Sequence, residues 1–314
     1  MTDYLIIYNR LKKNLKKLNK LLKNGEVSAF RLYEKDIPEY PYIIDIYNDH
    51  ALIYEKGKRL DDSDNEQLKL HYLHKENIEK AVTEVLNIRP ENIIVKTRLV
   101  QKGKDQYEKL KKTQKYFNIK ENGMKFKVNL YDYLDSGLFL DHRPLRKIIQ
   151  ETSNGKKVLN LFSYTGSISV AAAMGGGTVT TMDMSNTYLE WARDNFVLNK
   201  LDQYQHTFIK ADVLQYMKNL RDTFDIIVLD PPSFSNSKKM EEDFNVQDFH
   251  PILINTLMKH LSPAGVMYFS NNFTKFKLDS KLEDRYQIKE ITYKSIPEDF
   301  RNKKIHRCFE VRHK

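Results

Sequence analysis

Apolar residues recur at steps of three and four in the first part of the chain. They are Leu5, Tyr8, Leu11, Leu15, Leu18 and Leu22. This spacing predicts an amphipathic helix that ends near Asn24–Gly25 and whose other face is mostly lysine. We interpret the apolar stripe as a face that packs on a core, with the lysines in solvent. Contact of the lysines with phosphates or with a membrane surface is the alternative.

Mixed strand and helix patterns follow, up to residue 125. The segments YPYIIDIYN and HALIYEKG predict strands joined by a turn at Asp49, and ENIIVKTRLV predicts another strand. The acidic segment Leu60–Gln67 predicts a loop before a helix with Ile78 and Val82 on one face. A basic linker, KGKDQYEKLKK, leads to a hairpin that turns at Asn122–Gly123. Together these patterns predict a small α+β domain at residues 1–125 and a second domain at residues 126–314.

From Lys156 onward, strand and helix patterns alternate. The strands are KVLNLFS, GTVTTMD, HTFIKAD, FDIIVLD and GVMYFSNN, with helical patterns between them. Such alternation predicts a parallel sheet covered by helices on both faces. The tail adds two strand patterns, YQIKEITYKSI and KIHRCFEVRH, with no helix between them. We therefore expect an α/β fold with a seven-stranded, mostly parallel sheet and an antiparallel hairpin at its edge.

Acidic residues stand at the ends of three successive predicted strands, at Asp183, Asp212 and Asp230. In open α/β sheets, ligands bind beyond the carboxyl ends of the strands. The first strand ends in the turn Phe162–Gly166, whose single glycine makes a poor pyrophosphate cradle and argues against a nicotinamide-dependent oxidoreductase. Carboxylates suit a cationic ligand that also carries hydroxyls and an amine, such as S-adenosylmethionine. Another nucleoside, or a helix N-cap at each aspartate, is the alternative.

Composition indicates which kind of partner the protein binds and in which cellular compartment it works. The formal net charge of +10 and the pI near 9.2 favour an anionic partner, with nucleic acid first. The single cysteine, Cys308, excludes intramolecular disulfides and fits a reducing compartment. No apolar run approaches the roughly 20 residues of a membrane span. The charged N-terminal segment is unlike a signal peptide, so we expect a cytoplasmic protein without a metal site.

Several long motifs resemble a known family. They are NLYDYLDSGLFLDHRPLR, KVLNLFSYTGSISVAAAMGGG, TTMDMSNTYLEWARDNFVLN, FDIIVLDPPSFSNSKKM, MYFSNN and IHRCFEV. The chain resembles the class I methyltransferases of ribosomal RNA, which have a Rossmann-like fold. Within them it is most similar to the RlmK-type 23S ribosomal RNA (guanine-N7) methyltransferases, the C-terminal half of bifunctional RlmKL. The RlmL half, which modifies a different guanine, is absent, so we expect one activity only.

The resemblance implies a set of cofactor-binding residues for S-adenosylmethionine. Asp183 would hold the ribose, Asp212 the adenine side and the Phe162–Gly166 turn the methionine portion. The segment Leu138–Arg143 would close over the cofactor, or would act as a packing segment between domains. The full set is Asp141, His142, Arg143, Asn160, Phe162, Ser163, Thr165, Gly166, Asp183, Met184, Ser185, Asp212 and Asp230.

The segment DPPSF resembles the Asp/Asn-Pro-Pro-aromatic signature of enzymes that methylate nitrogen atoms. We expect Asp230, Pro231, Pro232 and Phe234 to form the catalytic corner. The two prolines fix φ and remove backbone donors, which leaves nearby carbonyls to accept. Phe234 would stack on a flipped base, or would pack under the loop.

The expected reaction is methylation of guanine N7 in 23S ribosomal RNA, or in a large-subunit assembly intermediate. Methylation of cytosine C5 needs an enzyme thiolate. Related cytosine-5 enzymes carry that thiol where this chain has Asn271 and Asn272. We expect Lys238, Lys239, Asn271 and Asn272 to contact the RNA, although solvated lysines are the simpler interpretation. Alternatives are methylation of another base position or of a protein side chain, and a non-catalytic RNA-binding assembly factor.

Overall fold

The computed structural model describes residues 3–56, 65–98, 113–235 and 244–314. The chain divides into two compact units, each of which is described separately. The N-terminal unit comprises Met1–Gly123, Val128–Ser136 and Glu298–Arg301, and the C-terminal unit comprises Met124–Lys127, Gly137–Pro297 and Asn302–Lys314. Among the described helices, none combines the length and the apolar character needed to cross a membrane.

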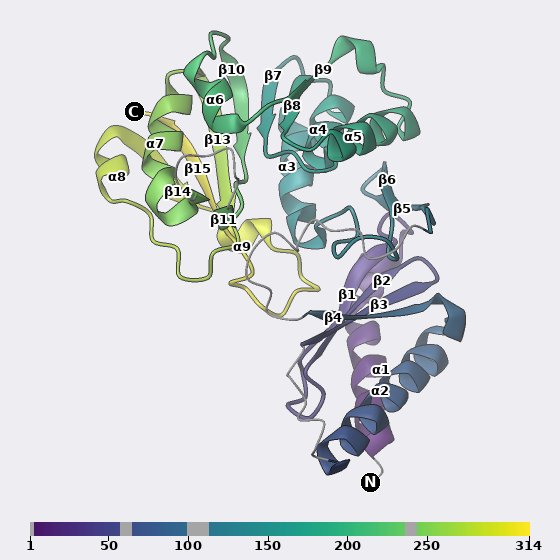
Figure 1. Ribbon diagram of the computed structural model, residues 1–314. Helices are drawn as coiled ribbons and strands as arrows, with labels where there is room; N and C mark the ends of the chain where they lie inside the picture. Colours follow the sequence, from purple (N-terminus) through teal and green to yellow (C-terminus); the bar gives the residue numbers. More distant parts are fainter. Residues whose placement is uncertain (1–2, 57–64, 99–112, 236–243) are drawn as a thin grey trace. The chain divides into compact units, whose positions relative to one another are not determined.

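Four strands and two long helices make up most of the N-terminal unit. The sheet has the order β1 (Ala29–Glu34), β2 (Tyr42–Tyr47), β3 (His50–Lys56) and β4 (Ile93–Arg98). α1 (Asp3–Leu22) and α2 (Asn65–Leu86) lie side by side in Figure 1. Their apolar faces and the sheet share one hydrophobic core, in which Ile7, Leu11 and Val82 are fully buried. The predicted packing role of the first helix is therefore confirmed.

The structure corrects two predictions in this unit. α2 begins at Asn65, so residues 65–67 of the predicted loop belong to a helix; residues 57–64 lie outside the described part of the chain. The strand β1 was not predicted, because Arg31 interrupts its apolar run. Arg31 is nevertheless buried and forms a bidentate pair with Asp45 of β2, with Nε–Oδ1 and Nη2–Oδ2 distances of 2.8 and 3.0 Å. A third bond of 2.8 Å joins Arg31 Nη1 to Glu34 Oε1.

Seven strands form the main sheet of the C-terminal unit (Figure 1). The order is β14 (Tyr286–Glu290), β15 (Arg307–His313), β13 (Leu261–Asn271), β10 (Phe224–Leu229), β7 (Lys157–Leu161), β8 (Thr178–Asp183) and β9 (Thr207–Lys210). Only β15 runs antiparallel to its neighbours, which are β13 and β14. The predicted seven-stranded, mostly parallel sheet and its antiparallel edge pair are confirmed. A four-residue helix, α9 (Thr292–Ser295), lies between β14 and β15, where no helix was predicted.

Helices cover both faces of this sheet. α3 (Arg143–Thr152), α4 (Ser167–Met174) and α5 (Asn186–Leu198) precede or follow β7 and β8, and α6 (Val213–Lys218) and α7 (Val246–Met258) flank β10. Leu159 and Leu161 of β7 join the core formed with α6 and α7. Asn160, which lies between them, bonds to Ser169 of α4 at 2.9 Å. Since successive side chains of a strand point to opposite faces, α4 and the α6–α7 pair cover opposite faces.

Two short strand pairs complete the described structure. β5 (Phe117–Glu121) and β6 (Met124–Val128) form the hairpin predicted at Asn122–Gly123, both of which have positive φ. β11 (Phe234–Ser235) pairs with β12 (Phe244–Asn245) next to the DPPSF segment.

The Arg31–Asp45 pair predicts the cost of breaking a buried charge pair. Asp45→Ala leaves the Arg31 guanidinium without its main partner, so the free energy of unfolding should fall by about 3–5 kcal/mol. Denaturant unfolding measures this change. Glu91→Ala, which breaks an exposed contact with Arg89, is the control and should change the free energy by at most about 1 kcal/mol. Equal effects of the two substitutions would contradict the role given to Asp45.

Candidate cofactor and acceptor site

The turn after β7 has an unusual backbone. Phe162, Tyr164 and Gly166 have φ values of 54°, 50° and 71°, in the left-handed region. At Gly166 a Cβ atom would lie 2.6 Å from the Cβ of Ala192, so the turn packs against α5 more closely than any other residue type allows. Thr165 is fully buried, and its Oγ1 donates to the carbonyl of Gly137 at 2.7 Å. The turn is thus held in one conformation at the carboxyl end of β7.

Asp183 connects the ends of two strands. It is the last residue of β8, and its Oδ2 accepts a 2.8 Å hydrogen bond from the backbone N–H of Tyr164 in the turn after β7. Its Oδ1 accepts another from the N–H of Ser185 at 2.8 Å. Burial raises the pKa of the carboxyl group, against the opposing effect of these backbone donors. The N-cap of α5 is Ser185 and not Asp183, so capping does not account for this aspartate.

Asp212 has a different environment. It is the N-cap of α6, and its Oδ1 accepts from the N–H groups of Leu214 and Gln215 at 2.8 and 3.3 Å. The capping alternative therefore applies to this residue. A contact of Asp212 with the adenine side of the cofactor stays a prediction.

Asp230 follows β10 and is fixed from the neighbouring strand. Its Oδ1 accepts a 2.5 Å hydrogen bond from the hydroxyl of Ser270 in β13. Beyond the two prolines, Phe234 has 56% of its surface exposed and makes an edge contact with Phe273 at 5.5 Å between ring centroids. Ser233 Oγ donates to Asn272 Oδ1 at 2.6 Å. The DPPSF corner is therefore attached to β13 at Asp230 and to the residues directly after β13 at Ser233 and Phe234, and more than half of the Phe234 surface is exposed.

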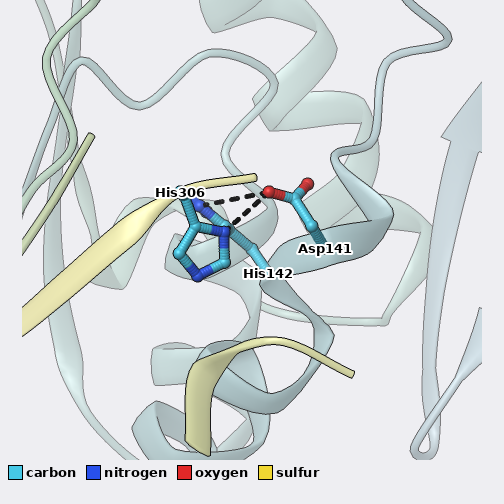
Figure 2. Close-up of side chains that lie close together, drawn as sticks. All are labelled: Asp141, His142 and His306. Carbon is cyan, nitrogen blue, oxygen red and sulfur yellow. Dashed lines mark hydrogen bonds and ion pairs between the residues drawn. The ribbon is translucent and has the colours of Figure 1, made fainter. Parts of the chain in front are cut away.

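A cluster of ionisable side chains stands next to Asp230. His142 Nδ1 lies 3.6 Å from Asp230 Oδ2. Figure 2 shows the cluster itself, in which His142 Nε2 lies 3.9 Å from Asp141 Oδ2. Asp141 Oδ2 also accepts a 2.8 Å hydrogen bond from His306 Nδ1. Burial lowers the pKa of His142, so this imidazole is neutral at pH 7. One nitrogen or oxygen atom from each of Asp141, His142 and His306 lies within 4.8 Å of the other two.

The remaining predicted site residues are placed as follows. Asn160 is buried, and its side-chain NH2 group donates to Ser169 Oγ. Ser163 Oγ and Asn271 Nδ2 are buried and have no hydrogen-bond partner among the described residues. Arg143 is buried at the first position of α3, and Met184 is exposed. Lys238 and Lys239 lie outside the described residues.

Sequence reasoning missed three residues of this region. They are Ser270, His306 and Ser295, whose Oγ lies 2.8 Å from His306 Nε2. His306 was part of a recognised strand motif but was not selected, because it lies 165 positions from Asp141. Ser270 stands directly before the two asparagines that were selected. A signal for Ser270 was available, since FDIIVLD and GVMYFSNN were predicted as successive strands of the same sheet.

The comparison with protein families decides the class. Residues 101–292 match the model of the S-adenosylmethionine-dependent methyltransferases. The chain belongs to this methyltransferase family. Its cofactor is therefore S-adenosylmethionine, and the expectation of a methyl-transferring enzyme with this cofactor is confirmed.

Similar proteins support the methyltransferase assignment over the full length. "Ribosomal RNA large subunit methyltransferase K" of Neisseria meningitidis is 48% identical over 100% of this chain and 89% of its own length. "Ribosomal RNA large subunit methyltransferase K/L" of Legionella pneumophila is 45% identical over 98% of this chain, which spans 43% of that relative. The crystal structure of SMU.776 complexed with SAH superposes with a TM-score of 0.77 at 25% identity, covering 99% of this chain and 82% of that one. The resemblance to the RlmK-type family is confirmed.

The methyltransferase site has features that fit S-adenosylmethionine. Asp183 offers a partly buried carboxyl group as an acceptor for hydroxyl groups, beside a turn whose backbone lies close to α5 at Gly166. The buried hydroxyl of Ser163 in this turn has no partner within the described structure, so it can bond to a polar ligand. The roles of the individual residues stay predictions.

Asp183→Asn tests the predicted ribose contact. The amide keeps the size of the side chain but has one acceptor oxygen, so it cannot accept from Tyr164, Ser185 and a ligand hydroxyl together. The dissociation constant of S-adenosylhomocysteine should rise about tenfold or more, which corresponds to about 1.4 kcal/mol. Titration calorimetry measures this value. Asp194→Asn, on the exposed side of α5, is the matched control, and an unchanged affinity in a folded Asp183→Asn protein would contradict the contact.

Proposed function

We propose that the protein transfers the methyl group of S-adenosylmethionine to N7 of a guanine in 23S ribosomal RNA. The observation that carries this proposal is the corner Asp230–Phe234, a diproline turn with an exposed aromatic ring at the end of the strand next to β7. The single cysteine of the chain, Cys308, is buried in the strand next to β13 and so offers no accessible thiol. The names of the relatives from Neisseria and Legionella support RNA of the large ribosomal subunit as the substrate. The chain spans less than half of the length of the K/L relatives, and the K-type activity is the one that we propose for it.

Positioning is the main catalytic contribution in this proposal. The cofactor supplies an electrophilic methyl carbon, and guanine N7 offers an accessible lone pair. The protein therefore needs neither a covalent nucleophile nor a strong base, and holding the two atoms in line supplies most of the acceleration. Phe234 would stack on the base. Asp230, which Ser270 holds in place, would orient the edge of the base. Because Pro231 and Pro232 have no N–H groups, carbonyls at this corner remain available as acceptors.

The state of the single cysteine supports a non-covalent reaction. Cys308 lies in β15 with no exposed surface. Burial raises the pKa of its thiol far above the ordinary value, so the thiolate that a cytosine-C5 reaction requires is not available there. Cys308→Ser should therefore methylate RNA at the rate of the unsubstituted protein.

The N-terminal unit is the proposed RNA-binding part, through its basic helix face and the net positive charge of the chain. The substrate is 23S ribosomal RNA or an assembling large-subunit particle, and we place the protein in the cytoplasm with its substrate. Binding by charge implies that affinity for RNA falls with rising salt concentration.

The substrate claim is tested on ribosomal RNA from cells that lack the protein. Nuclease digestion and mass spectrometry should show the loss of one 7-methylguanine from 23S ribosomal RNA, restored by the wild-type gene and not by the Asp230→Ala variant. An unchanged 7-methylguanine content would contradict the proposal. Loss of another methylated base instead would show that the protein methylates that base.

Phe234→Ala tests the stacking role. Aromatic stacking on a base is worth about 1–3 kcal/mol, so kcat/KM for RNA should fall by about 5- to 150-fold. Transfer of a radioactive methyl group to RNA from the deletion cells measures this ratio. Tyr204→Ala, which removes an exposed aromatic ring elsewhere in the same unit, is the control. A Phe234→Ala enzyme with unchanged kcat/KM would assign Phe234 to loop packing.

A further inference from the structure

The carboxylate of Asp230 is one end of a continuous row of polar side chains within the C-terminal unit. The row comprises Asp230 after β10, His142 and Asp141 in the short helix η3 (Leu140–His142), His306 before β15 and Ser295 in α9. The links are 3.6 Å, 3.9 Å, 2.8 Å and 2.8 Å long in that order. Three separate segments of the chain thus converge behind Asp230.

His306 joins Asp141 to Ser295. Its Nδ1 donates to Asp141 at 2.8 Å, and its Nε2 lies 2.8 Å from Ser295 Oγ. Ser295 Oγ also donates to the carbonyl of Thr292 at 3.0 Å. His306 has almost no exposed surface, so these partners fix the orientation of its ring.

His142 lies between two carboxylates with one ring proton. Burial keeps this imidazole neutral, and the groups that face it are Asp230, Asp141, His306 and Arg146. The rings of His142 and His306 meet edge to face, with centroids 4.7 Å apart. Because His306 already supplies a donor to Asp141 at 2.8 Å, the proton of His142 is better placed on Nδ1, which faces Asp230. The 3.6 Å separation is longer than a hydrogen bond and is of the kind that shortens when a substrate binds.

We propose that His142 is a positioning residue for Asp230, held in its Nδ1–H form by the Asp141–His306–Ser295 chain. Ser270 donates to Oδ1 of Asp230, and His142 faces Oδ2. Both oxygens therefore have a neighbour that fixes the orientation of the carboxyl group. Methylation of a ring nitrogen adds positive charge to the base. A neutral His142 beside Asp230 leaves that charge unopposed, whereas an imidazolium at His142 would oppose it.

This inference assigns to Asp141 and His142 a function that differs from contact with the cofactor. Only the kinetic test rests on the proposed function. The tautomer of His142 is a property of the protein without substrate, so the spectroscopic test can succeed even if the proposed function is wrong.

Two amide substitutions at His306 give the kinetic test. In His306→Asn the side-chain NH2 takes the place of Nδ1 and keeps a donor toward Asp141, whereas in His306→Gln it takes the place of Nε2 near Ser295. We expect kcat for methyl transfer to RNA to fall about 10²-fold in the Gln variant and to stay within about threefold in the Asn variant. KM for S-adenosylmethionine and RNA should not change in either.

Controls separate positioning from folding. Thermal unfolding and S-adenosylhomocysteine binding should match between the two amide variants, and His260→Asn, which replaces a histidine before β13, should have normal kcat. Equal kcat values for the Asn and Gln variants, or a change confined to KM, would overturn the proposal.

Nitrogen-15 NMR of the histidine side chains tests it without any RNA. In the full chain at pH 7.5, His142 should show a neutral ring with the proton on Nδ1. His142→Gln and His306→Gln assign the signals of the two histidines. A His142 protonated on Nε2, or a stoichiometric shift of the signals of both histidines on addition of Zn²⁺, would overturn the proposal, the latter by making the cluster a metal site.

Discussion

Parallel pairing of β7 with β8 and with β10 determines where Phe162, Asp183 and Asp230 lie. Leu161 pairs with Met182 on one side and with Leu229 on the other, so three strands end at the same level of the sheet. The residues that follow are Phe162, Asp183 and Asp230. A shift of this register by one residue would turn each side chain to the opposite face, which the buried cores on both faces prevent. The hydrophobic packing of the sheet thus fixes the spacing of the polar site.

Two consequences follow for the chemistry. On the side proposed for the cofactor, the edge is shaped by backbone, with left-handed residues and Gly166 against α5, and Asp183 joins this turn to β8. On the side proposed for the acceptor, it is shaped by side chains, with Asp230 held by Ser270 of β13 and faced by His142. The corner that carries Phe234 is also held by Asn272, directly after β13. A reaction that depends on alignment requires such rigidity.

The sequence predicted the elements whose signal is local. Alternating apolar strands and amphipathic helices gave the seven-stranded sheet, and the acidic residues at strand ends gave the edge at which a ligand would bind. It did not predict β1, since the burial of Arg31 depends on Asp45 in a neighbouring strand. It did not predict the row behind Asp230 either. His306 meets Asp141 only because β15 inserts between β14 and β13, an arrangement that has no local pattern.

The central claim is that one edge of the sheet holds the cofactor and the acceptor corner together. A crystal structure of the protein with bound S-adenosylhomocysteine tests this claim most directly. The account predicts the ribose hydroxyls within hydrogen-bond distance of the Asp183 carboxylate and the sulfur atom on the side of the Asp230–Phe234 corner. A ligand that binds away from Asp183, or whose sulfur faces away from this corner, would contradict it.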